Sequence, residues 1–121
     1  MLVGVTDIEI ARCSNHIKDS TSAKTFALKA IGVFDSSNNL IKRAQAYSQL
    51  GRALNYEEEF EDALKALDIA YEIVTTIKPV NFYAVYMIQK AKAHSLLGLG
   101  REAEAAVLQR RNAIINETLQ L

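Results

Sequence analysis

The sequence predicts an all-α protein, folded as an α-solenoid of three antiparallel helix hairpins. Residues that favour helices, above all alanine, leucine, lysine and glutamate, are abundant, while the 121 residues include one proline and five glycines. No stretch of useful length alternates apolar and polar residues with the period of two that marks a half-buried strand. The chain also repeats its pattern of small and apolar residues at an interval of 40 residues.

The 40-residue repeat is clearest in the small residues. They fall into three columns: Ala11, Gly51 and Ala91; Cys13, Ala53 and Ala93; Ala23, Ala63 and Ala103. Two helices approach closely only where a side chain is small, so a small residue at a fixed place in each unit predicts a repeated helix–helix contact. Three units, of residues 1–38, 39–78 and 79–121, cover the chain, which we interpret as a single domain.

The first unit is predicted to hold two helices. The segment Thr6-Asp7-Ile8-Glu9 has the form of a capping box, so a helix is expected to run from there to about residue 17. Residues 19–22 offer several N-cap side chains for a second helix, which is expected to end over residues 35–39.

The second and third units are predicted to repeat this arrangement. Asn38 or Asn39 caps a helix that runs to about residue 56, and the glutamates of 57–59 suit the positive end of the next helix, which runs to about residue 77. Pro79 stops that helix, because the residue before a proline is pushed out of helical geometry. Two further helices are predicted over residues 81–97 and 101–118, separated by Gly98-Leu99-Gly100.

The middle unit resembles a tetratricopeptide (TPR) repeat. The residues that match its motif, at the motif's spacings, are Tyr47, Leu50, Gly51, Leu54, Phe60, Ala63, Leu67 and Ala70. The flanking units match more loosely, since His94 and Arg110 stand where apolar or small residues are expected. The period is longer than the roughly 34 residues of the standard repeat and is similar to long variants of the family. The resemblance implies a right-handed superhelix whose first helices line a concave surface that binds a protein or peptide.

The resemblance also implies which residues line that surface. The family contacts its ligands through fixed positions of each first helix, and Gly51 sets the phase in this sequence. The candidate ligand-binding residues taken from these positions are Glu9, Arg12, Asn15, His16, Gln45, Ser48, Gln49, Arg52, Asn55, Tyr56, Ile88, Gln89, Lys92 and Ser95. They are separated by threes and fours, which places them on one face of each helix.

Two columns of like chemistry run along this expected face. They are a column of cations, Arg12, Arg52 and Lys92, and a column of small hydrogen-bonding side chains, Asn15, Asn55 and Ser95. Arginine pairs bidentately with carboxylates, and an asparagine amide both donates to and accepts from a peptide backbone. The expected ligand is therefore a protein or peptide with acidic side chains or a free C-terminal carboxylate. The alternative is that these residues form the solvated side of a helical spacer or dimerisation segment whose concave face binds nothing.

Composition argues against several other classes of partner. The chain has 14 basic and 14 acidic residues, whereas nucleic-acid binding normally needs a basic excess, so no nucleic acid is expected. No run approaches the roughly 18 apolar residues of a membrane span, so no membrane is expected. The N-terminus lacks the basic and apolar regions of a signal peptide and the chain has one cysteine, which together favour a cytoplasmic location.

The sequence predicts no enzyme, no cofactor and no metal. Cys13 has no second cysteine with which to share a zinc ion, and its column with Ala53 and Ala93 predicts a small buried packing residue. His16 and His94 form no metal-spaced pair, and nothing in the sequence would orient His16 for a dyad with Cys13.

The last predicted helix carries apolar residues that no further repeat unit would cover. They are Val107, Leu108, Ile114, Ile115 and Leu119. A solenoid usually ends in a capping helix with a polar outer face, and none follows here. We therefore expect either that the chain is part of a longer signalling protein or that its uncapped ends pair in a homodimer.

Overall fold

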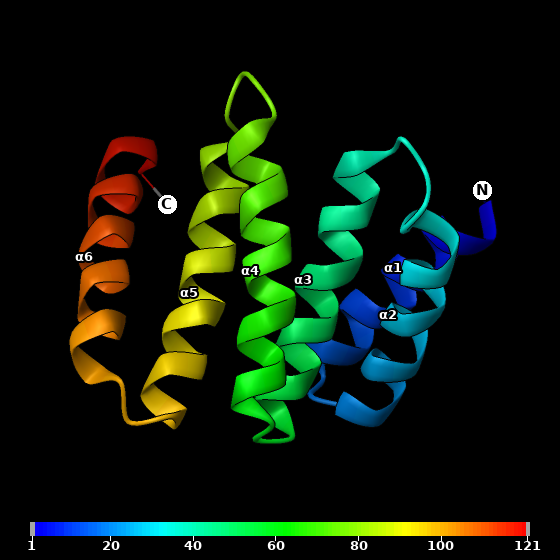
Figure 1. Ribbon diagram of the computed structural model, residues 1–121, viewed down its shortest axis with the longest axis horizontal. Coiled ribbons are helices and arrows are strands. Elements are labelled where there is room, and N and C mark those ends of the chain that lie inside the picture. The colour runs from blue at the N-terminus through cyan, green and yellow to red at the C-terminus, as the bar shows by residue number, and fades with distance from the viewer. Residues whose placement is uncertain (1, 121) are drawn as a thin grey trace.

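The computed structural model describes residues 2–120, and the side-chain surroundings from residue 4 onward. Within this range the chain forms six α-helices and no strand: α1 (Leu2–His16), α2 (Ser20–Phe34), α3 (Leu40–Tyr56), α4 (Phe60–Thr76), α5 (Phe82–Gly98) and α6 (Glu102–Leu119) (Figure 1). The prediction of an all-α protein with six helices is confirmed.

Three of the helices begin at a side-chain N-cap, and two of these caps, Asp19 and Asn39, are among the candidates that the sequence offers. The side chains of Asp19, Asn39 and Asn81 each accept a hydrogen bond from the backbone N–H three residues later, at 3.2, 3.2 and 3.1 Å. Each bond satisfies one of the N–H groups that the first turn of a helix leaves without a partner. These caps set the starts of α2, α3 and α5.

The predicted start of the first helix is wrong. Thr6 to Glu9 lie inside α1, which already begins at Leu2. The packing of the preceding turn explains the longer helix, because a Cβ added to Gly4 would lie 2.6 Å from Cε2 of Phe34 on α2. This close approach holds the turn before Thr6 against the neighbouring helix.

The α1–α2, α3–α4 and α5–α6 connections turn through the same backbone geometry. Lys18, Glu58 and Gly100 adopt left-handed φ values of 63°, 60° and 75°. In each turn the following N–H donates to the carbonyl five residues earlier, at 2.8, 2.9 and 2.8 Å, which is the bond that closes a helix C-terminus in the Schellman motif. Glycine is suited to this conformation because it has no Cβ. The predicted break at Gly98-Leu99-Gly100 is confirmed.

The third unit is displaced by two residues from the predicted 40-residue repeat. Lys18 and Glu58 are 40 residues apart, but Gly100 follows Glu58 by 42. The difference arises in α4, which has 17 residues where α2 has 15. The buried column that includes Ala23 and Ala63 therefore continues at Ala105, and Ala103 is exposed.

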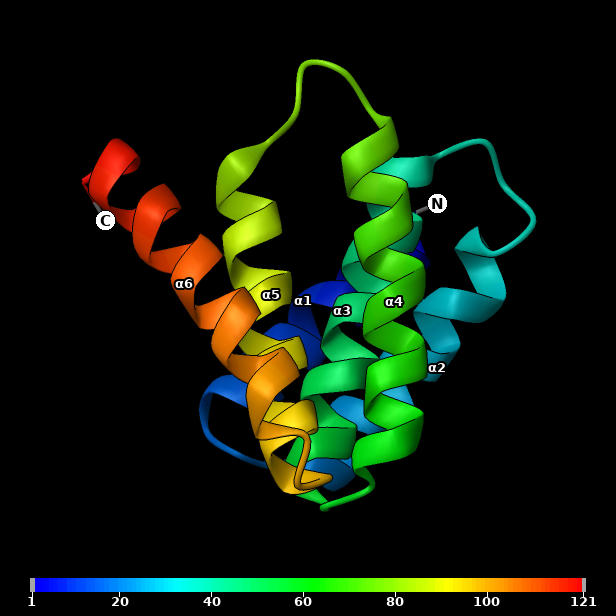
Figure 2. The same cartoon turned by 60° about the vertical axis from the view of Figure 1, so that its left-hand side comes forward.

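Each helix packs against the next along the chain, and α3 also contacts both α1 and α5. Among the described residues, the second helices α2, α4 and α6 make no such contacts with one another. The first helices α1, α3 and α5 therefore lie next to one another on one side (Figures 1 and 2). Figure 2 shows that the C-terminal half of α6 diverges from α5.

The core consists of small clusters between these helices. One joins Ile8, Phe34 and Ala46 of α1, α2 and α3, and another joins Leu67 of α4 to Ile88 of α5. A third lies between α5 and α6: Ala93, Leu96, Ala105 and Leu108.

Two burial predictions are wrong. Leu108, expected on an uncovered face of α6, is buried, because α6 packs on α5 through it. Cys13, expected to be buried, is exposed, although Ala53 of its column is buried, because no described helix precedes α1 to cover that face.

Candidate functional site

Two clefts open on the side formed by the first helices. The first, here called the apolar cleft, has a volume of about 760 Å³ and lies between α1, α3, α5 and the α4–α5 connection. Its apolar walls are made by Ile41, Val74, Ile77, Pro79, Tyr83, Met87 and Ile88. Ile41 and Tyr83 are 56% and 54% exposed, so two large apolar side chains at this cleft remain accessible to a partner.

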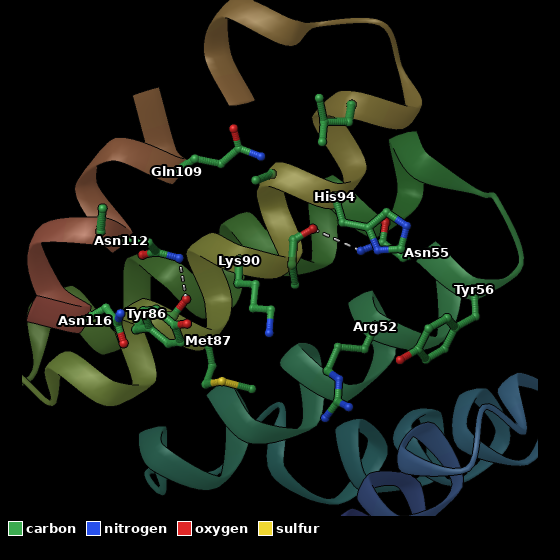
Figure 3. A pocket seen from close by; sticks show the side chains of 14 residues that line it. Arg52, Asn55, Tyr56, Tyr86, Met87, Lys90, His94, Gln109, Asn112 and Asn116 are labelled. Atoms are coloured by element: carbon green, nitrogen blue, oxygen red, sulfur yellow. Dashed lines mark hydrogen bonds between the residues drawn. The ribbon is translucent and has the colours of Figure 1, made fainter. Parts of the chain in front are cut away.

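The second cleft, here called the amide cleft, has a volume of about 590 Å³ and lies between α3, α5 and α6. Arg52 comes from α3, Lys90 and His94 from α5, and Gln109 and Asn116 from α6 (Figure 3). His94 lies beside Phe60, with 5.9 Å between the ring centroids. Toward the C-terminal end of α6, which leans away from α5, Gln109 and Asn116 are exposed, whereas Asn112 is buried and bonds to α5.

Arg52 and Met87 line both clefts, so the two clefts adjoin at these residues, and together they are here called the groove. Arg52 Nη1 donates to Gln49 Oε1 at 3.2 Å. The same oxygen accepts from Asn15 Nδ2 at 2.9 Å. A side chain held on one edge by a neighbour retains its other guanidinium N–H groups for an anion, since arginine has five donors.

The groove concentrates positive charge on a chain of zero formal net charge. Arg12, Arg52, Lys78 and Lys90 line it, and no Asp or Glu is among the described residues that line either cleft. A cleft lined by one sign of charge raises the local concentration of oppositely charged groups. The groove is therefore suited to a ligand with negative charge.

The prediction from Gly51 places all its α3 residues in the groove. Gln45, Ser48 and Gln49 line the apolar cleft, Asn55 and Tyr56 line the amide cleft, and Arg52 lines both. In α1, Arg12 lines the apolar cleft. Glu9 pairs with Arg12 at 2.9 Å, and His16 is exposed in the last turn of α1; neither lines a cleft.

The predicted column of ligand-facing amides is instead a buried seam between helices. Asn15 is fully buried and donates to both the backbone and the side-chain oxygen of Gln49, at 2.9 Å each. Asn55 is 3% exposed and donates to the Ala91 carbonyl at 3.0 Å. Because the amide nitrogens of both residues donate to the neighbouring helix, these buried amides hold helices together and are not presented to a ligand.

In α5 the prediction fails because of the two-residue displacement. Ile88 contributes to the apolar cleft although its side chain is only 3% exposed. Gln89 and Ser95 are buried, and Gln89 donates to Asn112 on α6 at 2.7 Å. Lys92 lines neither cleft and points toward α4 instead. Its Nζ lies 2.9 Å from Asp68 Oδ1 and 4.4 Å from the Tyr71 ring centroid.

The residues that take their place lie 42 residues after their α3 counterparts. Tyr83, Lys90 and His94 line the groove where Ile41, Ser48 and Arg52 line it in α3. A repeat interval measured from the N-caps Asn39 and Asn81 would have found them, since those caps are themselves 42 apart.

The described residues hold no group of three or more His, Cys, Asp or Glu side chains placed to bind a metal ion. Across the same part of the chain, no helix is both long enough and apolar enough to cross a membrane. In comparisons with protein-family models, with curated proteins and with solved structures, nothing matches the chain.

Proposed function

We propose that this chain is a TPR-like α-solenoid with a right-handed superhelix and that it binds a protein or peptide in the groove formed by its first helices. It acts as an interaction module, non-enzymatic, of a larger signalling or scaffold system. The ligand carries carboxylates, either on acidic side chains or at a free C-terminus.

The observation that carries this proposal is the position of Arg52. It lies where the two clefts meet, among cations and without an acidic residue in the lining. A guanidinium without a carboxylate partner in the same chain is an energetically favourable place for a carboxylate from another chain. Exposed Tyr83 and Ile41, which line the apolar cleft together with Arg52, offer apolar surface that a partner would bury.

Charge reversal at the centre of the groove tests the proposal. Arg52→Glu is compared with Arg110→Glu, a change of the same charge at an exposed α6 residue that lines neither cleft. In quantitative affinity capture, partners retained by the wild type and by Arg110→Glu should be lost from Arg52→Glu. Equal capture by all three proteins would contradict the proposal.

A second candidate function is self-association through α6. Val107, Ile114 and Leu119 on this helix are 44%, 62% and 41% exposed, and such surface favours burial against another chain. Sedimentation equilibrium of the wild type and of Ile114→Lys tests it. A dimer that Ile114→Lys dissociates supports the candidate, whereas a monomer at high protein concentration rules it out.

A further inference from the structure

This inference rests on the proposed function. We infer that the groove recognises two nearby features of its ligand: a bulky apolar side chain, which binds in the apolar cleft, and a carboxylate, which binds at Arg52. The ligand is thus a peptide segment in which an aromatic or branched aliphatic residue lies close to an acidic residue. Acidic charge alone does not satisfy the groove.

The apolar cleft is shaped for a side chain rather than for a charge. Val74, Ile77 and Pro79 wall it from the end of α4 and the α4–α5 connection. Tyr83 and Ile41 stand at its opening, each more than half exposed. A pocket of about 760 Å³ with mainly apolar walls and several polar groups in its lining is typical of sites that bury an apolar group and orient it by hydrogen bonds.

Charge and apolar surface meet at one edge of this cleft. Arg52 lines it together with Arg12, and Ser48 lies one turn before Arg52 on α3. Because Tyr83 and Arg52 both line this cleft, one ligand segment can seat a side chain against Tyr83 and extend along the cleft to the Arg52 guanidinium. Charge complementarity selects an acidic residue there, because Arg52 meets no carboxylate among the described residues of the lining.

The amide cleft continues the groove beyond Arg52. Gln109 and Asn116 are exposed on its α6 wall, and Figure 3 shows them on the side that faces α5. An amide can both donate to and accept from a peptide backbone, so this wall holds the ligand without selecting its side chains. Sequence preference then resides in the apolar cleft and at Arg52.

A displayed library of random 12-residue peptides, selected on the wild-type protein, tests the inference. Peptides enriched by the wild type should share an aromatic or branched aliphatic residue close to an acidic one. Two variants remove one feature each: Tyr83→Ser the apolar contact and Arg52→Gln the charge. Each has a matched control, Phe82→Ser, which removes an equally exposed aromatic residue outside both clefts, and Arg110→Gln.

The expected result is that synthetic copies of the enriched peptides bind Tyr83→Ser and Arg52→Gln about tenfold more weakly or worse, with the controls unchanged. Because Arg52 is half-buried, Arg52→Lys serves as a second variant that keeps the charge and should retain part of the affinity. Circular dichroism of every variant verifies folding.

The two levels of the proposal fail in different ways. Enriched peptides that depend on Arg52, but share no apolar residue and bind Tyr83→Ser normally, overturn this inference and leave the groove proposal standing. Loss of binding in Phe82→Ser equal to that in Tyr83→Ser also overturns the inference. Enriched peptides that are insensitive to Arg52→Gln, or the absence of any enrichment, overturn both.

Discussion

Ser95 on α5 donates a hydrogen bond from its Oγ to Asn55 Oδ1 on α3, at 2.7 Å, and both side chains are buried. The 40-residue alignment of the sequence places these two residues at equivalent positions of neighbouring units. In the folded chain they face each other instead, because α5 is displaced by two residues. They belong to the seam that joins α3 to α5, as Asn15 and Gln49 join α1 to α3.

The seam should contribute measurably to stability. Asn55→Ala and Ser95→Ala are each expected to lower the free energy of unfolding by about 1–3 kcal/mol, since each leaves a buried polar partner unsatisfied. The double variant should cost less than the two single costs added together, by about 1 kcal/mol, because both single changes break the same bond. Urea unfolding of the four proteins measures this coupling, and strictly additive costs would show that the two residues do not interact.

Helices α3 and α4 approach closely at Gly51, where a Cβ would lie 2.6 Å from Cδ2 of fully buried Leu67. Gly51→Ala is expected to destabilise the protein by about 1–3 kcal/mol through this overlap. Gly32→Ala is the matched control, because nothing lies within 4 Å of its added Cβ in α2. It should stabilise the protein by about 0.5–1 kcal/mol through helix propensity. Thermal unfolding that shifts both variants in the same direction would contradict this packing.

Tyr47 should make stability depend on alkaline pH. Burial raises the pKa of its phenol above 10.0, and the hydrogen bond to Asp35 Oδ1 at 2.7 Å adds to the rise. Folding therefore favours the protonated phenol, and this contribution is fully present below pH 10.0 and lost as the pH rises through the folded-state pKa.

Tyr47→Phe removes this contribution. The variant should be less stable than the wild type by about 1 kcal/mol at neutral pH, and the difference should shrink above about pH 10. The wild type has five tyrosines and the variant four, so the difference between their absorbance titrations reports Tyr47. This difference should show a phenol pKa above the ordinary range. A stability difference that stays constant through strongly alkaline pH would contradict the assignment.

Two lysines on α5 separate the observed groove from the predicted one. Lys90 lines the amide cleft, whereas Lys92 pairs with Asp68 outside the groove. Lys90→Gln should weaken ligand binding about threefold to tenfold with little change in stability. Lys92→Gln should lower the unfolding free energy by about 1 kcal/mol and leave binding unchanged. Binding is measured by fluorescence anisotropy with a selected peptide, and stability by urea unfolding. Weaker binding in Lys92→Gln together with unchanged binding in Lys90→Gln would instead support the groove residues predicted from the 40-residue alignment.

Local rules predicted most of the fold. Asp19, Asn39 and Asn81 are N-caps in the structure because a side-chain acceptor at the start of a helix acts on its own first turn and needs no distant partner. Thr6 has the same local pattern, but Gly4 packs on Phe34 and the helix starts earlier. Tertiary contact overrode the local signal there.

The residues predicted from the sequence coincide with the cleft linings in α3 and depart from them in α5. The α3 residues from Gln45 to Tyr56 that Gly51 selects all line the clefts, although Gln49 and Asn55 among them are buried. Helix α4 is two residues longer than α2. The α5 residues that the 40-residue alignment selects therefore lie on a different face of their helix from their α3 counterparts. Polarity alone also cannot separate a seam from a surface, since an asparagine suits both. The burial of Asn15 and Asn55 depends on which helix lies opposite.

A photo-cross-linking residue within the groove tests the central claim most directly. Tyr56 lies one turn beyond Arg52 on α3, lines the amide cleft and is 38% exposed, so a benzoyl-phenylalanine can replace it without disturbing the core. Leu28 on α2, which is 50% exposed and lines neither cleft, is the control position. We expect light-dependent cross-links to a selected peptide from position 56 and none from position 28. Cross-links from position 28 alone, or equally from both positions, would contradict a ligand bound in the groove.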